Sequence, residues 1–466
     1  MKHPPALLQY SFLAVMFTLL IGSTGCSRKE ALPEPAPADS LGRINQWLLD
    51  SMRAFYYWSE EIPAAPDFKQ ATPLFFKSLL STNDRFSWIT NQQDVIPDGN
   101  SYTNYGFHYA WVQVAGYDGY VGVVTFVSRF SAAGEAGWTR GMYFTAVNGT
   151  RVTAQNMEQA NTVLHTSGNV RVTMAAIVDN TVQPGNEVTL SHILFGENPF
   201  QLTSTFTAGG IATGYLFYNQ FSEMHDDDML AVFDKLRRAQ VTELILDLRY
   251  NPGGSVPRSA MMAVMIATQL KENDVYAIYE GNKKLGRRER TLKEVLQTAN
   301  STAGNDYALL KKRLLPLQRI FILTTGGTAS AAEMLINNLR PYITVVQIGA
   351  TTTGKDEASF VIRDGRVPRQ IPWEIHPIVY KLFNKNNQGA YHHGLVPAYP
   401  VNELAALPLY AIGSSKDPLI RKALEMIYGM DIPEGTPLRQ LPEIPVRVVY
   451  ASAAGQAKNA MVQVAR

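Results

Sequence analysis

Hydrophobic and polar positions follow three different patterns along the chain, and each pattern predicts a different kind of unit. Over residues 41–95, apolar side chains recur at helical spacing and predict a small helical module. Over residues 96–198, short apolar or alternating runs predict a β-rich unit that includes the tight turn Asn148-Gly149. Over residues 199–430, apolar strands alternate with helical patterns. This last pattern predicts an α/β layer around a largely buried sheet, so we expect a multidomain α/β (α+β) protein.

The individual elements follow from the same periodicities. The expected strands cover residues 112–114, 120–127, 141–149, 170–178, 187–190, 211–217, 243–249, 319–323 and 344–348. The expected helices cover residues 133–137, 155–164, 228–239, 259–268, 334–339 and 417–427. Residues 431–466 show one strand-like run, 446–450, and otherwise predict a polar C-terminal tail.

The start of the chain predicts export. Residues 6–21 are mostly apolar but too short for a comfortable membrane span. They lead into Ser23-Thr24-Gly25-Cys26, which resembles the lipobox of bacterial lipoproteins, although that family usually has leucine at the position of Ser23. The resemblance implies a signal peptide over 1–25, an acylated Cys26, a Pro- and Ala-rich tether over 26–40, and lipid anchoring in the cell envelope, in the periplasm or at the cell surface. The alternative is an ordinary secretory signal cleaved nearby.

Charge excludes one broad class of partner. The chain has 42 basic and 40 acidic residues, a formal net charge of +2, and no long basic run. Such a balance does not provide the electrostatic footprint of a nucleic-acid-binding protein. The basic pairs Lys283-Lys284 and Arg287-Arg288 predict a solvated loop.

The segment 323–333, Leu-Thr-Thr-Gly-Gly-Thr-Ala-Ser-Ala-Ala-Glu, places a serine between a buried strand and a helix N-terminus. This position would expose the Ser330 hydroxyl and direct backbone N–H groups toward a ligand. A second interpretation stays open, because Ser330-x-x-Glu333 before an apolar run is also the pattern of a helix capping box.

Four short motifs occur in the same unit and in a characteristic order. They are Asp247-Leu-Arg-x-Asn-Pro-Gly-Gly254, Thr328-Ala-Ser-Ala-Ala-Glu333, Gly354-Lys355 and Gly394-Leu-Val-Pro397. Together they resemble the tail-specific, or carboxyl-terminal processing, serine peptidases of family S41. The resemblance extends from the β-rich unit to Asp417 and implies a peptidase core with a ClpP/crotonase-like fold.

The resemblance assigns chemical roles to five residues. Ser330 would be the nucleophile and Lys355 its general base, a Ser–Lys dyad that requires a lysine pKa well below 10.4. The backbone amides of Gly253 and Ala331 would form the oxyanion hole. Ser359 stands where many family members have a glutamine that orients the lysine, so a third catalytic residue is an open question. No cofactor and no metal are implied. Taken alone, Lys355 could be a surface lysine and Asn251–Gly254 a simple turn.

The β-rich unit resembles a PDZ domain. The resemblance rests on Ala136-Gly137-x-x-Arg140-Gly141 before the turn Val147-Asn148-Gly149. A PDZ domain binds an extended peptide end by adding a strand to a sheet edge. We expect the loop at Gly106 and Phe107 to receive the peptide carboxylate. The alternative is a PDZ-shaped spacer without peptide affinity.

These observations predict an exported, lipid-anchored serine endopeptidase that cleaves exposed or unfolded polypeptides near their C-termini through an acyl-enzyme. A catalytically inactive peptide-binding lipoprotein with the same fold is the main alternative. A carbohydrate-processing protein is a third one, but the chain offers no convincing carboxylate pair for it.

Other polar groups predict structural roles. The adjacent His392 and His393 are expected in a turn or at the surface, and Asp226-Asp227-Asp228 at a solvated helix start rather than at a cation site. His108 and His376 have no suitable partners nearby in the sequence.

Overall fold

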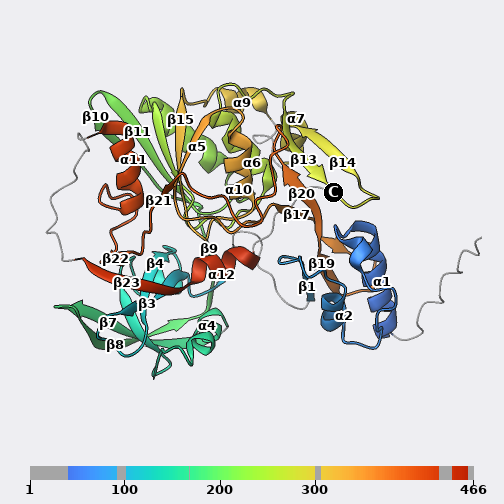
Figure 1. Cartoon of the computed structure of the whole chain (residues 1–466), viewed down its shortest axis with the longest axis horizontal. Coiled ribbons are helices and arrows are strands. Elements are labelled where there is room, and N and C mark those ends of the chain that lie inside the picture. The colour runs from blue at the N-terminus through green and yellow to red at the C-terminus, as the bar shows by residue number, and fades with distance from the viewer. Residues whose placement is uncertain (1–39, 92–100, 167, 300–305, 430–442, 460–466) are drawn as a thin grey trace, which may run out of the picture.

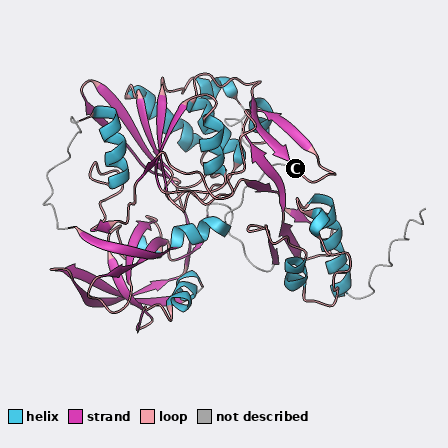
Figure 2. Ribbon diagram, in the orientation of Figure 1, coloured by secondary structure: helices cyan, strands magenta, loops and turns pink. Residues whose placement is uncertain are grey.

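The computed structural model describes residues 40–91, 101–166, 168–299, 306–429 and 443–459. It confirms a mixed α/β protein with several sheets (Figures 1 and 2). No helix in these ranges is long and apolar enough to cross a membrane. Cys26 and most of the predicted tether lie outside the described residues, so the lipoprotein assignment stays a prediction.

The centre of the molecule is a six-stranded sheet. Its strands, in spatial order, are β10 (Phe200–Ala208), β11 (Ile211–Tyr218), β12 (Glu243–Asp247), β15 (Arg319–Thr324), β16 (Thr344–Gly349) and β21 (Tyr399–Pro400). Strands β11 to β21 are parallel, and β10 pairs antiparallel with β11. The carboxyl ends of β12, β15 and β16 therefore lie next to one another, at the edge where parallel sheets usually bind ligands.

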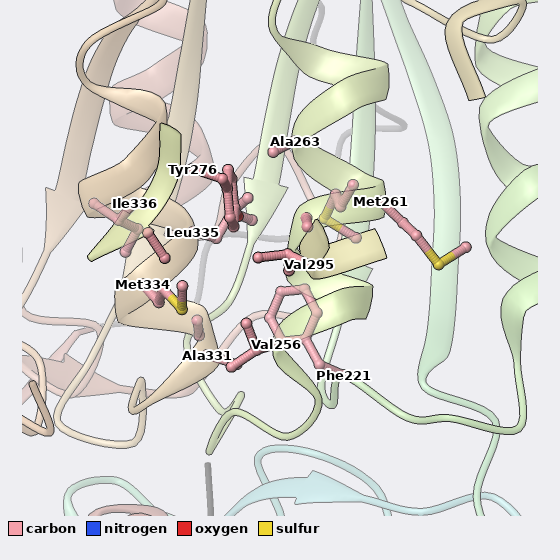
Figure 3. Packing of buried hydrophobic residues seen from close by; sticks show 14 of the residues in the cluster. Phe221, Val256, Met261, Ala263, Tyr276, Val295, Ala331, Met334, Leu335 and Ile336 are labelled. Atoms are coloured by element: carbon pink, nitrogen blue, oxygen red, sulfur yellow. The ribbon is translucent and has the colours of Figure 1, made fainter. Parts of the chain in front are cut away.

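Helices cover both faces of this sheet, because its central strands are apolar on both sides. Leu244 and Leu246 share a cluster with helices α5 (Asp226–Arg238), α6 (Val256–Ile266) and α10 (Ala331–Leu339). Ile245, between them, packs in the cluster of helix α11 (Pro418–Tyr428). Figure 3 shows side chains of α6 and α10 packed in one apolar cluster, with Val256 of α6 near Ala331 in the first turn of α10.

A second sheet lies beside the first and was not predicted. Its order is β14 (Arg287–Thr291), β13 (Val275–Glu280), β20 (Ile378–Phe383) and β17 (Glu357–Ser359), and the short helices α7 (Leu292–Gln297) and α9 (Tyr307–Lys311) belong to the same region. The expected solvated loop is therefore wrong for Arg287-Arg288, which begin β14. Both arginines are exposed, and charged residues are common on edge strands, so this strand lacks the apolar pattern that would predict it.

The N-terminal module contains the predicted helices α1 (Ser40–Phe55) and α2 (Thr72–Ser78), with a single 3-10 turn, η1 (Ser59–Glu61), between them. The module also supplies a strand, β1 (Trp88–Asn91), which pairs with β19 (Trp373–His376) of the core and shares a sheet with β18 (Ile362–Arg363). It is therefore joined to the core by main-chain hydrogen bonds as well as by apolar packing.

The β-rich unit is built on a longer sheet that runs β22 (Ala406–Leu407), β23 (Ile444–Ala451), β3 (Phe107–Val114), β4 (Val121–Val127), β5 (Tyr143–Val147), β7 (Asn169–Val178) and β8 (Thr181–Ser191), with β6 (Thr150–Arg151) on β5. Helices α3 (Ala132–Glu135) and α4 (Met157–His165) accompany it, and β2 (Ser101–Asn104) pairs with β9 (Ile193–Gly196). Asn148 and Gly149 both have positive φ, as the predicted turn requires.

The C-terminal segment departs from the predicted tail. Strand β23 contains the strand-like run expected at 446–450, but it is an integral strand of the β-rich sheet. The helix α12 (Ser452–Asn459) follows directly. Periodicity identified the strand, but it could not identify a partner strand from the other end of the chain.

Candidate active site

Three loops meet at the carboxyl edge of the central sheet. Residues 251–254 follow β12, residues 325–330 follow β15, and residues 350–355 follow β16. Their backbones are hydrogen-bonded to one another: Ala329 N donates to Asn251 O at 3.0 Å, and Thr353 N donates to Thr328 O at 2.9 Å. The fold thus brings together three of the four motifs that are widely separated in the sequence.

Ser330 has an unusual backbone at the start of α10. Its φ is +64° and its ψ is −120°, a region that costs a non-glycine residue about 1–3 kcal/mol. The side chain is buried, and among the described residues its Oγ has no hydrogen-bond partner. A helix cap would use that oxygen as an acceptor. Only the Glu333 half of the capping box is formed, with Ser330 N donating to Glu333 Oε2 at 2.8 Å. Strain and an unused hydroxyl both favour a functional serine.

Glu333 connects residues 325–330, which we call the serine loop, to residues 350–355, which we call the lysine loop. Besides the Ser330 amide, its carboxylate accepts the amides of Gly354 at 2.7 Å and Lys355 at 2.8 Å. The hydroxyl of Thr352 donates to it as well. Burial raises the pKa of Glu333, although these hydrogen bonds oppose the shift. The sequence marked this glutamate only as a capping residue, and its second set of partners could not be read from local spacing.

Lys355 is not a surface lysine, since it is 2 % exposed. Burial lowers the pKa of Lys355 to about 8, partly opposed by the carboxylates of Glu357, Glu333 and Asp84. Its Nζ lies 4.9 Å from the centroid of the Phe86 ring. This pKa is in the range that a lysine general base needs near neutral pH.

The N-terminal module supplies part of the lysine pocket, which the sequence did not predict. In addition to the Phe86 ring, the Arg85 guanidinium donates to Gly354 O at 2.6 Å and to His392 O at 2.7 Å. Both side chains lie in the segment between α2 and β1. The signal that could have found them is the polar, aromatic run 84–88, which has no helical periodicity.

The fourth motif closes onto the lysine loop through two glycines. Gly354 has φ +86° and Gly394 has φ +93°. A Cβ on Gly354 would lie 2.3 Å from His392 O, and one on Gly394 would lie 2.2 Å from Thr352 O. Leu395 N also donates to Thr352 Oγ1 at 2.7 Å. Only glycine permits this close approach. The Gly394 motif therefore packs directly against the backbone of the lysine loop and fixes its position.

The predicted oxyanion-hole residues lie beside Ser330. Gly253 has φ +107°, and a Cβ there would lie 2.6 Å from Ser330 Cβ. Its amide already donates to Asn251 Oδ1 at 2.9 Å, so this donor faces its own loop instead of an open position. Ala331 is the first residue of α10, where an amide has no preceding helical carbonyl to bind. The oxyanion roles of both residues stay predictions.

Two further predicted positions have a defined place. Ser359 is buried in β17, and its role as lysine orienter stays a prediction. Gly106 and Phe107 line a small cavity together with Pro252 of the loop after β12 and Ala453 of α12. The predicted carboxylate loop thus faces the catalytic unit.

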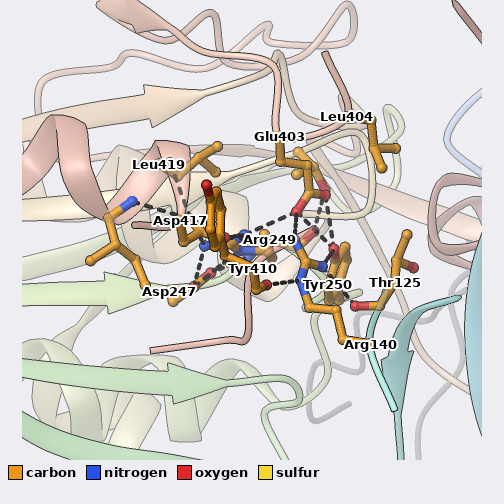
Figure 4. A network of polar contacts seen from close by, with 12 residues as sticks. Thr125, Arg140, Asp247, Arg249, Tyr250, Glu403, Leu404, Tyr410, Asp417 and Leu419 are labelled. Carbon is orange, nitrogen blue, oxygen red and sulfur yellow. Dashed lines mark hydrogen bonds and ion pairs between the residues drawn. The ribbon is translucent and has the colours of Figure 1, made fainter. Parts of the chain in front are cut away.

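A buried ionic network joins the β-rich unit to the core (Figure 4). Arg249, fully buried, pairs with Asp247, Glu403 and Asp417 at 2.8–2.9 Å. Arg140 from the β-rich unit donates to Glu403 at 2.9 Å. The network lies directly before residues 251–254 and ties that loop to the neighbouring unit.

The other candidate groups have structural surroundings. His392 and His393 are exposed in a turn, as predicted. Asp226 is not solvated, since it is buried and pairs with Arg258 at 2.9 Å. Burial lowers the pKa of His108 and of His376 to about 4, so both are neutral near pH 7. Within the described ranges, no group of three or more His, Cys, Asp or Glu residues is placed to hold a metal.

Comparison with known proteins adds independent evidence. Residues 212–370 match the family model of peptidase family S41, and residues 43–88 match that of the peptidase S41 N-terminal domain. The carboxyl-terminal-processing protease of Synechocystis sp. is 25% identical over 304 residues, which are 64% of this chain and 63% of the relative. The chain thus spans less than two thirds of that relative. The carboxy-terminal processing protease CtpB of Bacillus subtilis is 23% identical over 80% of this chain and 71% of the relative.

A solved structure is similar over most of the chain. A crystal structure of a Bacteroides fragilis protein, described as a candidate S41 protease, superposes with a TM-score of 0.66 and 25% identity. The match covers 86% of this chain and 99% of that one. The matched regions include Phe86 of the N-terminal module and the two loops that carry Ser330 and Lys355. Over residues 43–88 and 212–370 the chain therefore matches peptidase family S41, and its resemblance to the carboxyl-terminal processing members is confirmed.

Proposed function

We propose that the chain is a serine endopeptidase that cleaves exposed or unfolded polypeptides near their C-termini, with Ser330 as nucleophile and Lys355 as general base. One observation carries the proposal. The Glu333 carboxylate accepts hydrogen bonds from the backbone amides of both Ser330 and Lys355, at 2.8 Å each. It thereby fixes the backbone of a strained serine relative to the backbone of a buried lysine. A structural serine and a structural lysine would need neither feature.

The first chemical step is proton transfer from Ser330 Oγ to the neutral amine of Lys355, as Oγ attacks the scissile carbonyl carbon. A lysine with a pKa of about 8 is neutral in about one tenth of the molecules at pH 7 and in about half of them at pH 8, so the fraction of competent base rises through this range. The product is a tetrahedral intermediate bound to Oγ, with a negative oxygen and a protonated lysine.

The amides of Ala331 and Gly253 would stabilise that oxygen. Gly253 N must first leave Asn251 Oδ1, and a rotation of the Asn251 amide that releases it would also disturb the bond from Asn251 Nδ2 to Tyr218 O. The Lys355 ammonium then gives its proton to the leaving amine, which breaks the peptide bond and forms the acyl-enzyme. Water, deprotonated by Lys355, attacks the ester and releases the new C-terminus.

Hydrolysis of casein or an unfolded peptide tests the proposal. Ser330→Ala and Lys355→Ala should each reduce kcat/KM by at least about 1,000-fold. The exposed residues Ser191 and Lys69 provide matched controls, and Ser191→Ala and Lys69→Ala should retain the wild-type rate. Equal activity in all variants would exclude the dyad. A wild-type protein that binds peptide without cleaving it would support the inactive peptide-binding alternative.

We also propose that the chain is exported and anchored by an acylated Cys26. The support is the lipobox-like Ser23–Cys26 after an apolar leader, together with the single cysteine of the chain. Detergent phase partitioning tests this directly. Wild-type protein should enter the detergent phase, and Cys26→Ser should remain in the aqueous phase. Equal partitioning of both would contradict acylation at this residue.

A further inference from the structure

The strand that completes the PDZ-like sheet comes from the C-terminal end of the chain. Strand β3 pairs with β4 along one edge and with β23 along the other. The β23 pairing is antiparallel, from Val446 opposite Val114 to Ala451 opposite Ala110. In Figure 1, β23 lies next to β3 although the two segments are far apart in the sequence.

This edge is the place where a PDZ-like unit would add a peptide strand. Gly106 and Phe107, the expected carboxylate loop, lie at the beginning of β3. The antiparallel direction brings the end of β23 toward them, and Ser452 Oγ accepts a hydrogen bond from Tyr109 N at 2.8 Å. Val449 and Tyr450 pack against the apolar cluster of the PDZ-like unit. The segment therefore makes the contacts that an extended apolar ligand would make.

The same segment continues onto the serine loop, residues 325–330. A Cβ on Gly327 would lie 3.0 Å from Ala453 Cβ, and one on Gly326 would lie 3.4 Å from Ala454 Cβ. These two glycines precede Ser330 in the loop after β15. Ala453 also lines the cavity shared by Gly106 and Pro252. One continuous segment thus covers the edge of β3 and contacts the serine loop.

We propose that residues 444–455 are a built-in occupant of the peptide-binding edge, which an extended apolar C-terminal segment of a substrate must displace. The inference rests on the proposed function, because it assigns a role to the same catalytic site. A tethered segment competes at an effective concentration in the millimolar range, so weak or polar peptides would be rejected. Ser330 is 0 % exposed and Lys355 is 2 % exposed, as expected if this is the closed state.

A reversible cross-link tests the displacement. Gln113 and Arg447 lie directly opposite each other in the β3–β23 pairing, and both are exposed. Opposed antiparallel residues have Cα atoms at about 4.5–5.5 Å, within the range of a disulfide. The variant is Gln113→Cys with Arg447→Cys, in a Cys26→Ser and Ser330→Ala background that has no other thiol and no cleavage. The same background with serine at both positions is the matched control.

The probe is a fluorescein-labelled peptide with the sequence of residues 444–451 and a free carboxylate, followed by anisotropy. The oxidised variant should bind at least 10-fold more weakly than its reduced form, and the serine control should not respond to reductant. Equal Kd values in both states would overturn the proposal. A second variant that lacks residues 443–466 should bind at least 10-fold more tightly than the full chain. Absence of binding in the folded truncated chain would also overturn it.

The failure of this inference can be told apart from failure of the proposed function. Binding is measured without catalysis, so it does not depend on the dyad. With Ser330 restored, a fluorophosphonate should label the oxidised variant at least 10-fold more slowly than the reduced one. Absence of Ser330 labelling in every state would contradict the proposed function and leave the binding result intact. Equal labelling rates would show that the segment does not control the reactivity of Ser330, and would overturn that part of the proposal.

Discussion

At the scale of single residues, the site depends on one carboxylate. Glu333 accepts four hydrogen bonds, from three backbone amides and the Thr352 hydroxyl. A carboxylate has enough lone pairs for all four donors, whereas a neutral amide has only one acceptor oxygen. The residue therefore positions Ser330 and Lys355 through their backbones and does not itself need to touch a substrate.

Glu333→Gln tests this positioning role. The amide nitrogen of glutamine would face two donors, and each buried donor left without an acceptor costs about 1–3 kcal/mol. We expect a lower free energy of unfolding in urea and a fall in kcat that exceeds any change in KM. Glu289→Gln is the control, because Glu289 is exposed. Wild-type kcat in a folded Glu333→Gln variant would contradict the role.

The residues that could be predicted share one property. Ser330, Gly253 and Lys355 each follow a buried apolar strand, so their common edge can be deduced from strand order alone. Phe86 and Arg85 reach the lysine pocket from a different part of the chain. The run 84–88 without helical periodicity marks their segment as unusual, but no local pattern identifies Lys355 as its tertiary partner. The occupied amide of Gly253 could not be predicted either, since it depends on the rotamer of Asn251.

At the scale of elements, the lysine loop is held between segments that no single pattern connects. Arg85 bridges the carbonyls of Gly354 and His392, and so ties the N-terminal module to both sides of the loop.

The apolar strands of the central sheet were predicted because they are buried on both faces. Strands β14 and β17 to β19 were not, because they are short and polar or mixed.

Arg85→Met tests whether the bridge serves the active site. Methionine keeps much of the apolar volume but cannot donate to either carbonyl. We expect Lys355 to be held less firmly and kcat to fall about 10-fold, with less than about 2 kcal/mol lost in urea unfolding. Arg43→Met on the exposed side of α1 is the control and should match the wild type. Unchanged kcat in Arg85→Met would show that the module is only a structural support.

At the scale of the whole molecule, a buried ionic network connects the units. Arg249 is fully buried and pairs with three carboxylates, and Arg140 extends the network into the β-rich unit. Buried charges of this kind are stable only while every member keeps its partners. The network joins the β-rich unit to the α/β core, and the C-terminal strand β23 completes the sheet of the β-rich unit.

Arg249→Met should be strongly destabilising. It would leave the buried carboxylates of Asp247 and Asp417 without their main partner, and breaking a buried pair costs about 3–5 kcal/mol. Arg319→Met is the matched control, because its pair with Glu243 is partly exposed and worth about 0.2–1 kcal/mol. Urea unfolding measures both. Similar small losses in the two variants would contradict the structural role of the network.

The most direct test of the central claim is the pH dependence of covalent labelling by a fluorophosphonate, with the adduct mapped by mass spectrometry. The proposed base Lys355 can accept a proton only when it is neutral, and burial lowers its pKa to about 8. The labelling rate of Ser330 should therefore rise with pH through about 8 and level off above it, and labelling should be lost in Ser330→Ala and Lys355→Ala. An adduct on another residue, or a rate on Ser330 that is flat from mild acid to alkali, would contradict the Ser330–Lys355 dyad.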